Sequence, residues 1–383
     1  MAAGLAAAEG GRKVVLLEAR NVGYGASGRN GGQLIPGLRW SAGDLVEEFG
    51  LARAQAIYSV AMIAVDRVAG RIARHGIDCD HKAGHLEAAW KPAHLEAMAR
   101  EAELLARDFG RTESEMIAPS DMGRHIATPL FHGGLFDPRG GHFHPLNYLL
   151  GLANAAMAAG VTIYEGSPVT ELGDGTSVTA ISRNGSVSAP QAIVAADAWT
   201  DDLLPAARGL TVPIVNYNIA TAPLGDLADR LLPSDAAIAD SRFVLNYFRL
   251  SSDKRMIFGG GEKYRQATPA SIADFVRPHV ASVFPELAGV PIEFGWGGVV
   301  SVTMNRLPHL ARQGHIWFAH GFSGHGALLT TLAGELLAEA IDGDSAQFDT
   351  LAALPHRRFP GGRLFAKPLA TLGLLYYALK DRL

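Results

Sequence analysis

Residues 12–32, with the sequence RKVVLLEARNVGYGASGRNGG, combine a carboxylate with a run of glycines. Glu18 directly follows the apolar stretch 13–17, which predicts a short strand. A carboxylate at the end of such a strand can accept hydrogen bonds from the ribose hydroxyls of a dinucleotide. Because a glutamate after a strand is usually an ordinary surface residue, this interpretation of Glu18 depends on the loop that follows.

That loop, GYGASGRNGG at 23–32, has five glycines in ten residues and is called the first glycine loop below. Glycine lets a backbone approach a ligand closely and direct its N–H groups at an anion. Ser27, Arg29 and Asn30 add a hydroxyl, a cation and an amide. A flexible surface turn is the alternative, but a turn does not need so many polar anchors. We therefore expect half of a nucleotide site here.

A second glycine loop, GFSGHG at 321–326, lies between an apolar stretch and a long helical pattern. Its N–H groups would occupy a helix N-terminus, where a phosphate or an electron-rich ring edge is favoured. His325 could face such a ring or a substrate, or could be a structural histidine.

The charge balance is 34 basic against 38 acidic residues, and the basic residues are scattered, so no nucleic-acid partner is expected. Cys79 is the only cysteine, which excludes an intrachain disulfide and a multi-cysteine metal site; we expect it to be buried and expect no metal. No signal peptide or membrane span is evident, so the chain is predicted to be cytoplasmic. The apolar and basic tail 359–383 predicts a helix docked on the core, or alternatively one on a membrane surface.

Strand and helix patterns alternate, which predicts an α/β protein, α+β overall. The antiparallel pattern of 211–264 interrupts the nucleotide-type segments, so two discontinuous domains are expected. The predicted elements are helices over 2–9 (ending at Gly10), 43–75 and 93–108, a strand over 84–90, a hairpin turned at Asn184-Gly185, and antiparallel strands near 211–222, 243–250 and 255–261.

The stretches LLEARNVGYGASGRNGGQ, HGIDCDH, IVAADAW and AHGFSGHGALLTTLAGELLAEAI resemble the FAD-dependent amine and D-amino-acid oxidase superfamily. The similarity covers essentially the whole chain and is closest to the gamma-glutamylputrescine oxidase-like branch. It implies a glutathione-reductase-like FAD-binding domain, formed by 1–80, 140–205 and 296–383. An antiparallel-sheet substrate domain would comprise 81–139 and 206–295.

The resemblance also implies site residues. Glu18 would bind the adenosine ribose, and Val169 would meet the adenine through its backbone. The other residues expected to bind FAD are Ala26, Ser27, Gly28, Arg29, Asn30, Gly31, Gly32, Ala196, Trp199, Gly321, Phe322, Ser323, Gly324, His325 and Gly326. Some members of the superfamily attach flavin through a cysteine shortly before the second loop. None occurs there in this chain, so the FAD is expected to be non-covalent.

Members of the superfamily begin with a strand and a G-x-G-x-x-G turn, whose last glycine would fall just before Met1. The FAD-binding domain is therefore expected to lack its first strand and the main N–H donors to the pyrophosphate. A chain that began at Met1 would be poorly folded or poor in FAD. A start internal to a longer reading frame is the favoured hypothesis, and a truncation with lost activity is the alternative.

The reaction implied by the resemblance is hydride transfer from the carbon bearing a neutral amine to flavin N5. Imine hydrolysis and reoxidation by oxygen or another acceptor would follow. His325, Tyr247 and Arg249 are the candidate catalytic residues; Arg249 could grip a substrate carboxylate, or could point to solvent. The expected substrate is a small amine or amino acid of the gamma-glutamylputrescine type. A D-amino-acid or sarcosine-like oxidase or dehydrogenase, and a catalytically silent remnant, are the alternatives.

Overall fold

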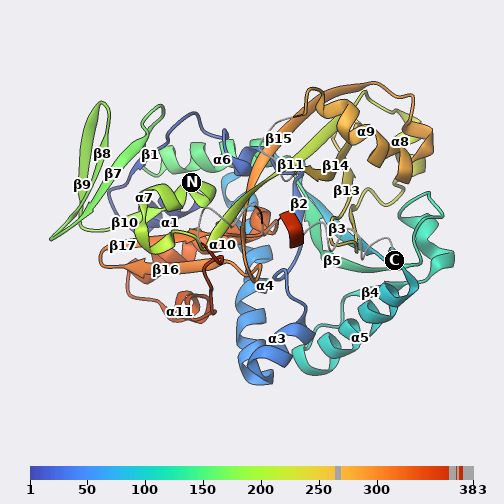
Figure 1. Cartoon of the computed structure of the whole chain (residues 1–383), viewed down its shortest axis with the longest axis horizontal. Helices are drawn as coiled ribbons and strands as arrows, with labels where there is room; N and C mark the ends of the chain where they lie inside the picture. The colour runs from blue at the N-terminus through green and yellow to red at the C-terminus, as the bar shows by residue number, and fades with distance from the viewer. Residues whose placement is uncertain (264–268, 362–367, 369–370, 374–383) are drawn as a thin grey trace.

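The computed structural model of the chain describes residues 1–263, 269–361, 368 and 371–373. Figure 1 shows short strands and helices on the left and a large curved sheet on the right. The long strands β11 (Thr211–Thr221) and β15 (Ile292–Thr303) run between the two parts. The predicted combination of alternating helices and strands with an antiparallel sheet is confirmed.

The left part contains two small sheets with parallel strand pairs. Strand β1 (Val15–Leu17) pairs with β6 (Thr162–Tyr164), and β10 (Ala192–Val194) pairs with β17 (Ile316–His320), which β16 (His309–Gln313) joins on its other edge. Within the described residues no strand joins the β1–β6 pair to the other sheet. All five residues of β17 are buried, as expected for a strand covered on both faces.

Helix α10 (Gly326–Ile341) packs closely on α1 (Ala2–Glu9). The contact requires a small residue, because a Cβ added at Gly334 would lie 2.8 Å from the backbone nitrogen of Ala3. The other elements of this part are α3 (Ala42–Phe49), α4 (Leu51–His75), α6 (Pro145–Ala158), α11 (Ala346–Ala352), and the three-stranded antiparallel sheet of β7 (Val169–Asp174), β8 (Val178–Ser182) and β9 (Gly185–Ala189).

The large sheet has the strand order β15-β11-β14-β13-β12-β3-β5-β2, with β4 paired to β5. Helix α9 (Ile272–Val283) packs on the β11, β14 and β15 end of this sheet, where Val276, Val280 and Val283 are buried. The remaining elements are β2 (Gln33–Leu34), β3 (Lys82–Ala88), β4 (Glu115–Ile117), β5 (Gly134–His142), β12 (Ala237–Asp240), β13 (Tyr247–Leu250), β14 (Met256–Lys263), α5 (Pro92–Phe109) and α8 (Asp226–Leu231).

Several of the predicted elements are confirmed, including the hairpin at Asn184-Gly185 and the helix that ends at Gly10. The single helix predicted over 43–75 is wrong. The segment instead forms two helices, α3 and α4, separated by Gly50. The φ of 76° at Gly50 is not helical, so the chain changes direction there. Strand β12 was not predicted and pairs in parallel with β3.

Two main groups of buried apolar side chains fill the molecule. One joins α1, α3, α4, α6, α10 and α11, and the other lies between the large sheet and α8 and α9. The domain boundaries proposed from the sequence remain a prediction; the one at 295/296 falls inside the continuous strand β15.

Cys79 is buried, as predicted, and burial raises the pKa of its thiol to about 11. Among the described residues, no helix is both long enough and apolar enough to span a membrane. Most of the helix predicted in the tail 359–383 lies outside the described residues.

Six buried or partly buried histidines should make the fold sensitive to acid. Burial lowers the pKa of His309 and His325 to about 3, and that of His85, His142, His320 and His356 to about 4. These folded-state pKa values lie below the unfolded value near 6.5. The neutral histidines therefore contribute fully to the free energy of unfolding above pH 6.5, and this contribution is lost as the pH falls toward 4. Each of these differences in pKa corresponds to roughly 3–5 kcal/mol, against a total stability of about 5–15 kcal/mol. We expect the free energy of unfolding to fall steeply between pH 6.5 and 4 in urea titrations.

The variant His309→Gln tests this interpretation, because glutamine keeps a polar partner for His320, whose Nε2 lies 2.8 Å from His309 Nδ1, but does not titrate. It should make the decline of stability with acid shallower. The exposed His132→Gln is the matched control and should leave the decline unchanged. Equal stability at pH 7 and pH 4 in the unmodified chain would contradict the prediction.

Candidate active site

The first glycine loop is organised by Asn30. The loop contains the single helical turn α2 (Ala26–Arg29). The Asn30 side-chain amide donates to the carbonyls of Ala26 and Ser27, both at 3.1 Å, and its Oδ1 accepts from the Gly32 N–H at 2.8 Å. One side chain therefore connects the helical turn to the end of the loop, which explains why an amide follows the turn.

The end of this loop lies against the large sheet with no room for side chains. A Cβ added at Gly31 would come within 2.3 Å of the Tyr247 ring, and one at Gly32 would come within 2.1 Å of the Phe143 carbonyl oxygen. Gly32 also has a φ of 78°, which favours glycine. The sequence pattern Gly31-Gly32 is thus required by close packing at this junction.

Tyr247 and Arg249 lie on the same face of β13 and both contact this loop. Arg249 is buried; its Nε donates to the Gly31 carbonyl at 2.7 Å, and its Nη1 donates to the Leu250 carbonyl at 3.0 Å. Burial lowers the pKa of Arg249 to about 10, opposed by the charges of Asp80 and Asp235, so it stays protonated at neutral pH. These contacts tie the guanidinium to the loop rather than to solvent.

The Tyr247 hydroxyl joins two amides that sequence reasoning missed. It lies 2.5 Å from Asn216 Oδ1 and 2.9 Å from Asn218 Oδ1, both on β11. The available sequence signal was the alternation of polar residues in VNYNIA, in the middle of a largely apolar strand. Tyr247, Asn216 and Asn218 form a polar cluster beside Gly31.

Strand β15 contacts both glycine loops. Near its middle, Trp296 Nε1 donates to the Arg29 carbonyl at 2.9 Å, and Arg29 Nη1 donates to the Gly297 carbonyl at 3.3 Å. Further along, Ser323 donates its N–H to the Ser301 carbonyl at 3.0 Å. Because a strand rises about 3.3 Å per residue, the two loops lie roughly 13 Å apart along β15.

The second glycine loop connects the end of β17 to α10. His325 occupies the position before the first residue of α10, and its side chain is buried. Its Nδ1 is buried without a partner within the described residues. Burial is the main cause of its low pKa, with Arg39 and His85 lowering it further, so the imidazole is neutral at pH 7. A neutral imidazole can donate or accept a hydrogen bond there.

Glu18 and Val169 are both expected at the adenosine end of the cofactor. In the structure, the short segment 167–169 connects them. The Glu18 carbonyl accepts from the Ser167 N–H at 2.8 Å, two residues before Val169 at the start of β7. The Glu18 carboxylate accepts from the Arg20 N–H at 2.8 Å. The structure thus brings these two residues to one end of the β1–β6 pair.

Ala196 precedes a single helical turn, Asp197–Trp199, that follows β10 and ends with Trp199, which is exposed. Asp197, which sequence reasoning missed, accepts a hydrogen bond from the Gly321 N–H at 2.9 Å. The available signal was a carboxylate shortly after an apolar strand pattern. This bond connects the turn to the second glycine loop.

These features fit an elongated dinucleotide. A Cβ added at Gly25 or at Gly324 would meet no protein atom within 4 Å, so both loops have backbone that borders open space. His325 Nδ1 and Ser301 Oγ are buried polar atoms without a partner in the described part of the chain.

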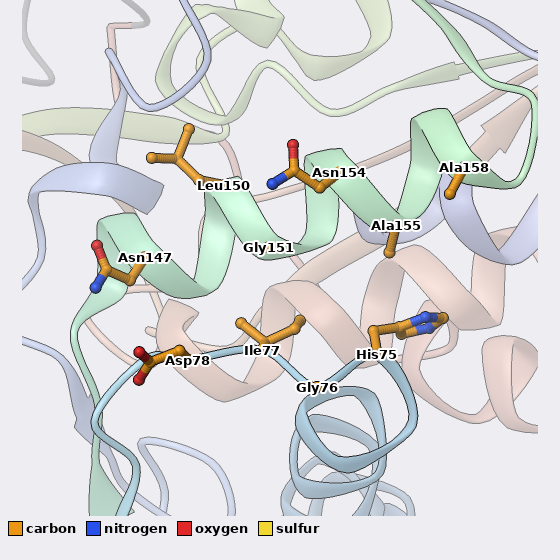
Figure 2. Close-up of a pocket in the computed structure, with 10 residues that line it drawn as sticks. All are labelled: His75, Gly76, Ile77, Asp78, Asn147, Leu150, Gly151, Asn154, Ala155 and Ala158. Carbon is orange, nitrogen blue, oxygen red and sulfur yellow. The ribbon is translucent and has the colours of Figure 1, made fainter.

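A separate pocket of about 520 Å³ lies between α6 and the turn after α4. Figure 2 shows that His75 and Asp78 lie on one side of it, and Asn147 and Asn154 on the other. None of its lining residues belongs to either glycine loop. Within the described residues, no group of three or more histidine, cysteine or acidic side chains could hold a metal ion.

Comparisons with known proteins agree with this geometry. The family described as FAD dependent oxidoreductase matches residues 1–340. The chain belongs to this family of FAD-dependent oxidoreductases. It is 36% identical to the gamma-glutamylputrescine oxidoreductase of Escherichia coli, covering 98% of this chain and 89% of that protein. It is 34% identical to a probable oxidoreductase, OrdL, of Haemophilus influenzae, covering 100% and 89%.

FAD is therefore the cofactor of this FAD-dependent oxidoreductase, as predicted. The expectation of impaired activity receives no support from these comparisons. The solved glycine oxidase of Geobacillus kaustophilus has the same fold, with a TM-score of 0.75 over 89% of this chain and 91% of that one, at 19% identity. The L-proline dehydrogenase of P. horikoshii matches with a TM-score of 0.73 over 89% of each chain, at 17% identity.

Proposed function

We propose that this FAD-dependent oxidoreductase oxidises an amine or amino acid, with a gamma-glutamylated amine such as gamma-glutamylputrescine as its preferred substrate. The observation that carries the proposal is the 36% identity with the gamma-glutamylputrescine oxidoreductase of Escherichia coli over nearly the whole chain. An identity of this extent over 98% of the chain supports a shared reaction class.

We assign the two glycine loops to non-covalent binding of FAD. Glu18 and Val169 would hold the adenosine end, the first loop the pyrophosphate and ribityl chain, and the second loop the ring end. When bound, FAD supplies the acceptor for a hydride from the substrate carbon that bears the amine. Water would hydrolyse the imine to a carbonyl product, and oxygen or another acceptor would take the two electrons from the reduced FAD.

The protein's own contribution is to bind and orient a neutral amine. His325 is neutral at pH 7, so it adds no positive charge that would repel a cationic amine as it enters the site. The cluster of Tyr247, Asn216 and Asn218 offers hydrogen-bonding groups on the large sheet beside Gly31. We place the substrate between this cluster and the second loop.

A peroxide assay with the FAD-loaded full chain tests the proposal. Gamma-glutamylputrescine should give the highest kcat/KM in a panel with putrescine, sarcosine, glycine and D-alanine, and aldehyde should form in proportion to substrate consumed. An artificial electron acceptor in place of oxygen separates an oxidase from a dehydrogenase. A preference for D-alanine or sarcosine would favour the alternative substrate class, and no oxidation of any amine by the yellow protein would contradict the proposal.

A further inference from the structure

Two residues, Ser323 in the second glycine loop and Asp197 in the turn after β10, adopt a backbone conformation that favours glycine. Asp197 has a φ of 42° and Ser323 a φ of 52°. A residue with a side chain adopts this region at an energetic cost, although aspartate tolerates it better than most. Glycine occurs at three positions of the loop, yet Ser323 and the neighbouring Asp197 carry polar side chains. The contacts that the Asp197 and Ser323 side chains make must therefore offset the cost of this backbone conformation.

Both side chains hold the same residue, Gly321. The Gly321 N–H donates to Asp197 Oδ1 at 2.9 Å, and the Ser323 hydroxyl donates to the Gly321 carbonyl at 3.1 Å. Gly321 cannot be replaced easily, because it has a φ of 73° and an added Cβ would lie 2.5 Å from Thr303 Cγ2. The first residue of the loop is thus fixed through both of its backbone polar groups.

The contacts extend to β15 and to the turn after β10. The Ser323 N–H donates to the Ser301 carbonyl at 3.0 Å. Burial raises the pKa of the Asp197 carboxyl to about 6, and the N–H groups of Gly321, Ser301 and Ala198 oppose this shift. Three chain segments therefore meet at the Asp197 carboxylate, and their backbone N–H groups stabilise its charged form.

We propose that Asp197 and Ser323 act as a clamp on Gly321 that sets the second glycine loop at the correct position for FAD. This inference rests on the proposed placement of FAD between the two loops. Asp197 and Ser323 are positioning residues in this account: they act on the cofactor through the loop backbone. Their side chains are retained against the backbone preference for glycine because the loop must be held before FAD binds.

Glycine substitutions separate this role from backbone strain. Asp197→Gly and Ser323→Gly each remove one half of the clamp while relieving the unfavourable φ, so the apoprotein should keep its thermal midpoint. Each should raise the dissociation constant for FAD about tenfold, measured by quenching of FAD fluorescence. Because both act on Gly321, the double variant should weaken binding by clearly less than the product of the single effects.

Two further variants provide the controls. Asp197→Asn keeps an acceptor oxygen and tolerates the same φ, so it should bind FAD within about twofold of the unmodified chain. Asp201 makes a bond of the same kind, in which its Oδ2 accepts from the Gly209 N–H at 2.9 Å, but this bond does not involve the loop. Asp201→Ala should lower the thermal midpoint without changing the FAD affinity.

Unchanged FAD affinity in both glycine variants, or equal weakening by Asp201→Ala, would overturn the clamp. So would an Asp197→Asn variant that binds FAD as weakly as Asp197→Gly. Failure of the unmodified chain to bind FAD would instead overturn the proposed placement of the cofactor, and the clamp with it. A chain that binds FAD but oxidises no amine would leave the clamp standing and reject only the proposed reaction.

Discussion

Replacing Gly32 with alanine is expected to lower the affinity for FAD by about two orders of magnitude. The added Cβ would lie 2.1 Å from the Phe143 carbonyl oxygen, a backbone atom that cannot turn aside. The Phe143 N–H also donates to the Gly32 carbonyl at 3.0 Å, so the two chains are fixed to each other. The positive φ alone costs ~1–2 kcal/mol for alanine, and relief of the clash must add to that cost. Fluorescence titration with FAD measures the effect.

Gly160→Ala is the matched control for this variant. Gly160 also has a positive φ, 92°, but an added Cβ there meets no atom within 4 Å, and the residue lies in neither loop. This variant should reduce the free energy of unfolding by the cost of placing alanine at a positive φ, and it should leave the affinity for FAD unchanged. If both variants bound FAD equally well, the close approach at Gly32 would have no part in holding the cofactor.

Arg249→Lys is expected to weaken FAD binding about ten- to hundredfold, since hydrogen bonds from a charged group are worth ~1.5–3 kcal/mol. Lysine cannot make both of the contacts that the guanidinium makes with the Gly31 and Leu250 carbonyls. The affinity for FAD should therefore fall, while KM changes similarly for substrates with and without a carboxylate. Flavin titration and steady-state kinetics measure the two quantities.

Gamma-glutamylputrescine and putrescine form the appropriate substrate pair, because only the first carries a carboxylate. A rise in KM confined to gamma-glutamylputrescine would instead support the role predicted from the sequence, in which Arg249 grips the substrate. Arg277→Lys is the control variant: its guanidinium donates to two backbone carbonyls, of Ala288 and Val290, both at 3.1 Å, away from either loop. It should leave FAD binding unchanged.

Local sequence patterns were sufficient to predict the two glycine loops and several of the strands, whereas the long strands β5 and β15 were not predicted. A glycine-rich loop after a strand with a terminal carboxylate is a short-range signal, and alternation placed Tyr247 and Arg249 on the same face of a strand. The apolar neighbours Phe248 and Leu250 point to the opposite face, where they join the core beneath the large sheet.

Contacts between distant segments could not be predicted in this way. Alternation shows that Arg249 shares a face with Tyr247, but not that this face lies against Gly31, more than two hundred residues earlier in the chain. Asp197 was overlooked for the same reason, because its partner is the Gly321 backbone, and a backbone group leaves no signature in a sequence. The helix division at Gly50 was missed because the apolar periodicity continues across it.

Hydrogen exchange of the full chain with and without FAD tests the central claim, that both glycine loops enclose one FAD, most directly. FAD at one equivalent per chain should slow amide exchange in both 23–32 and 321–326, and leave the pocket of His75 and Asn147 unaffected. Stoichiometric FAD binding that protects only one of the loops, or protects that pocket instead, would contradict it.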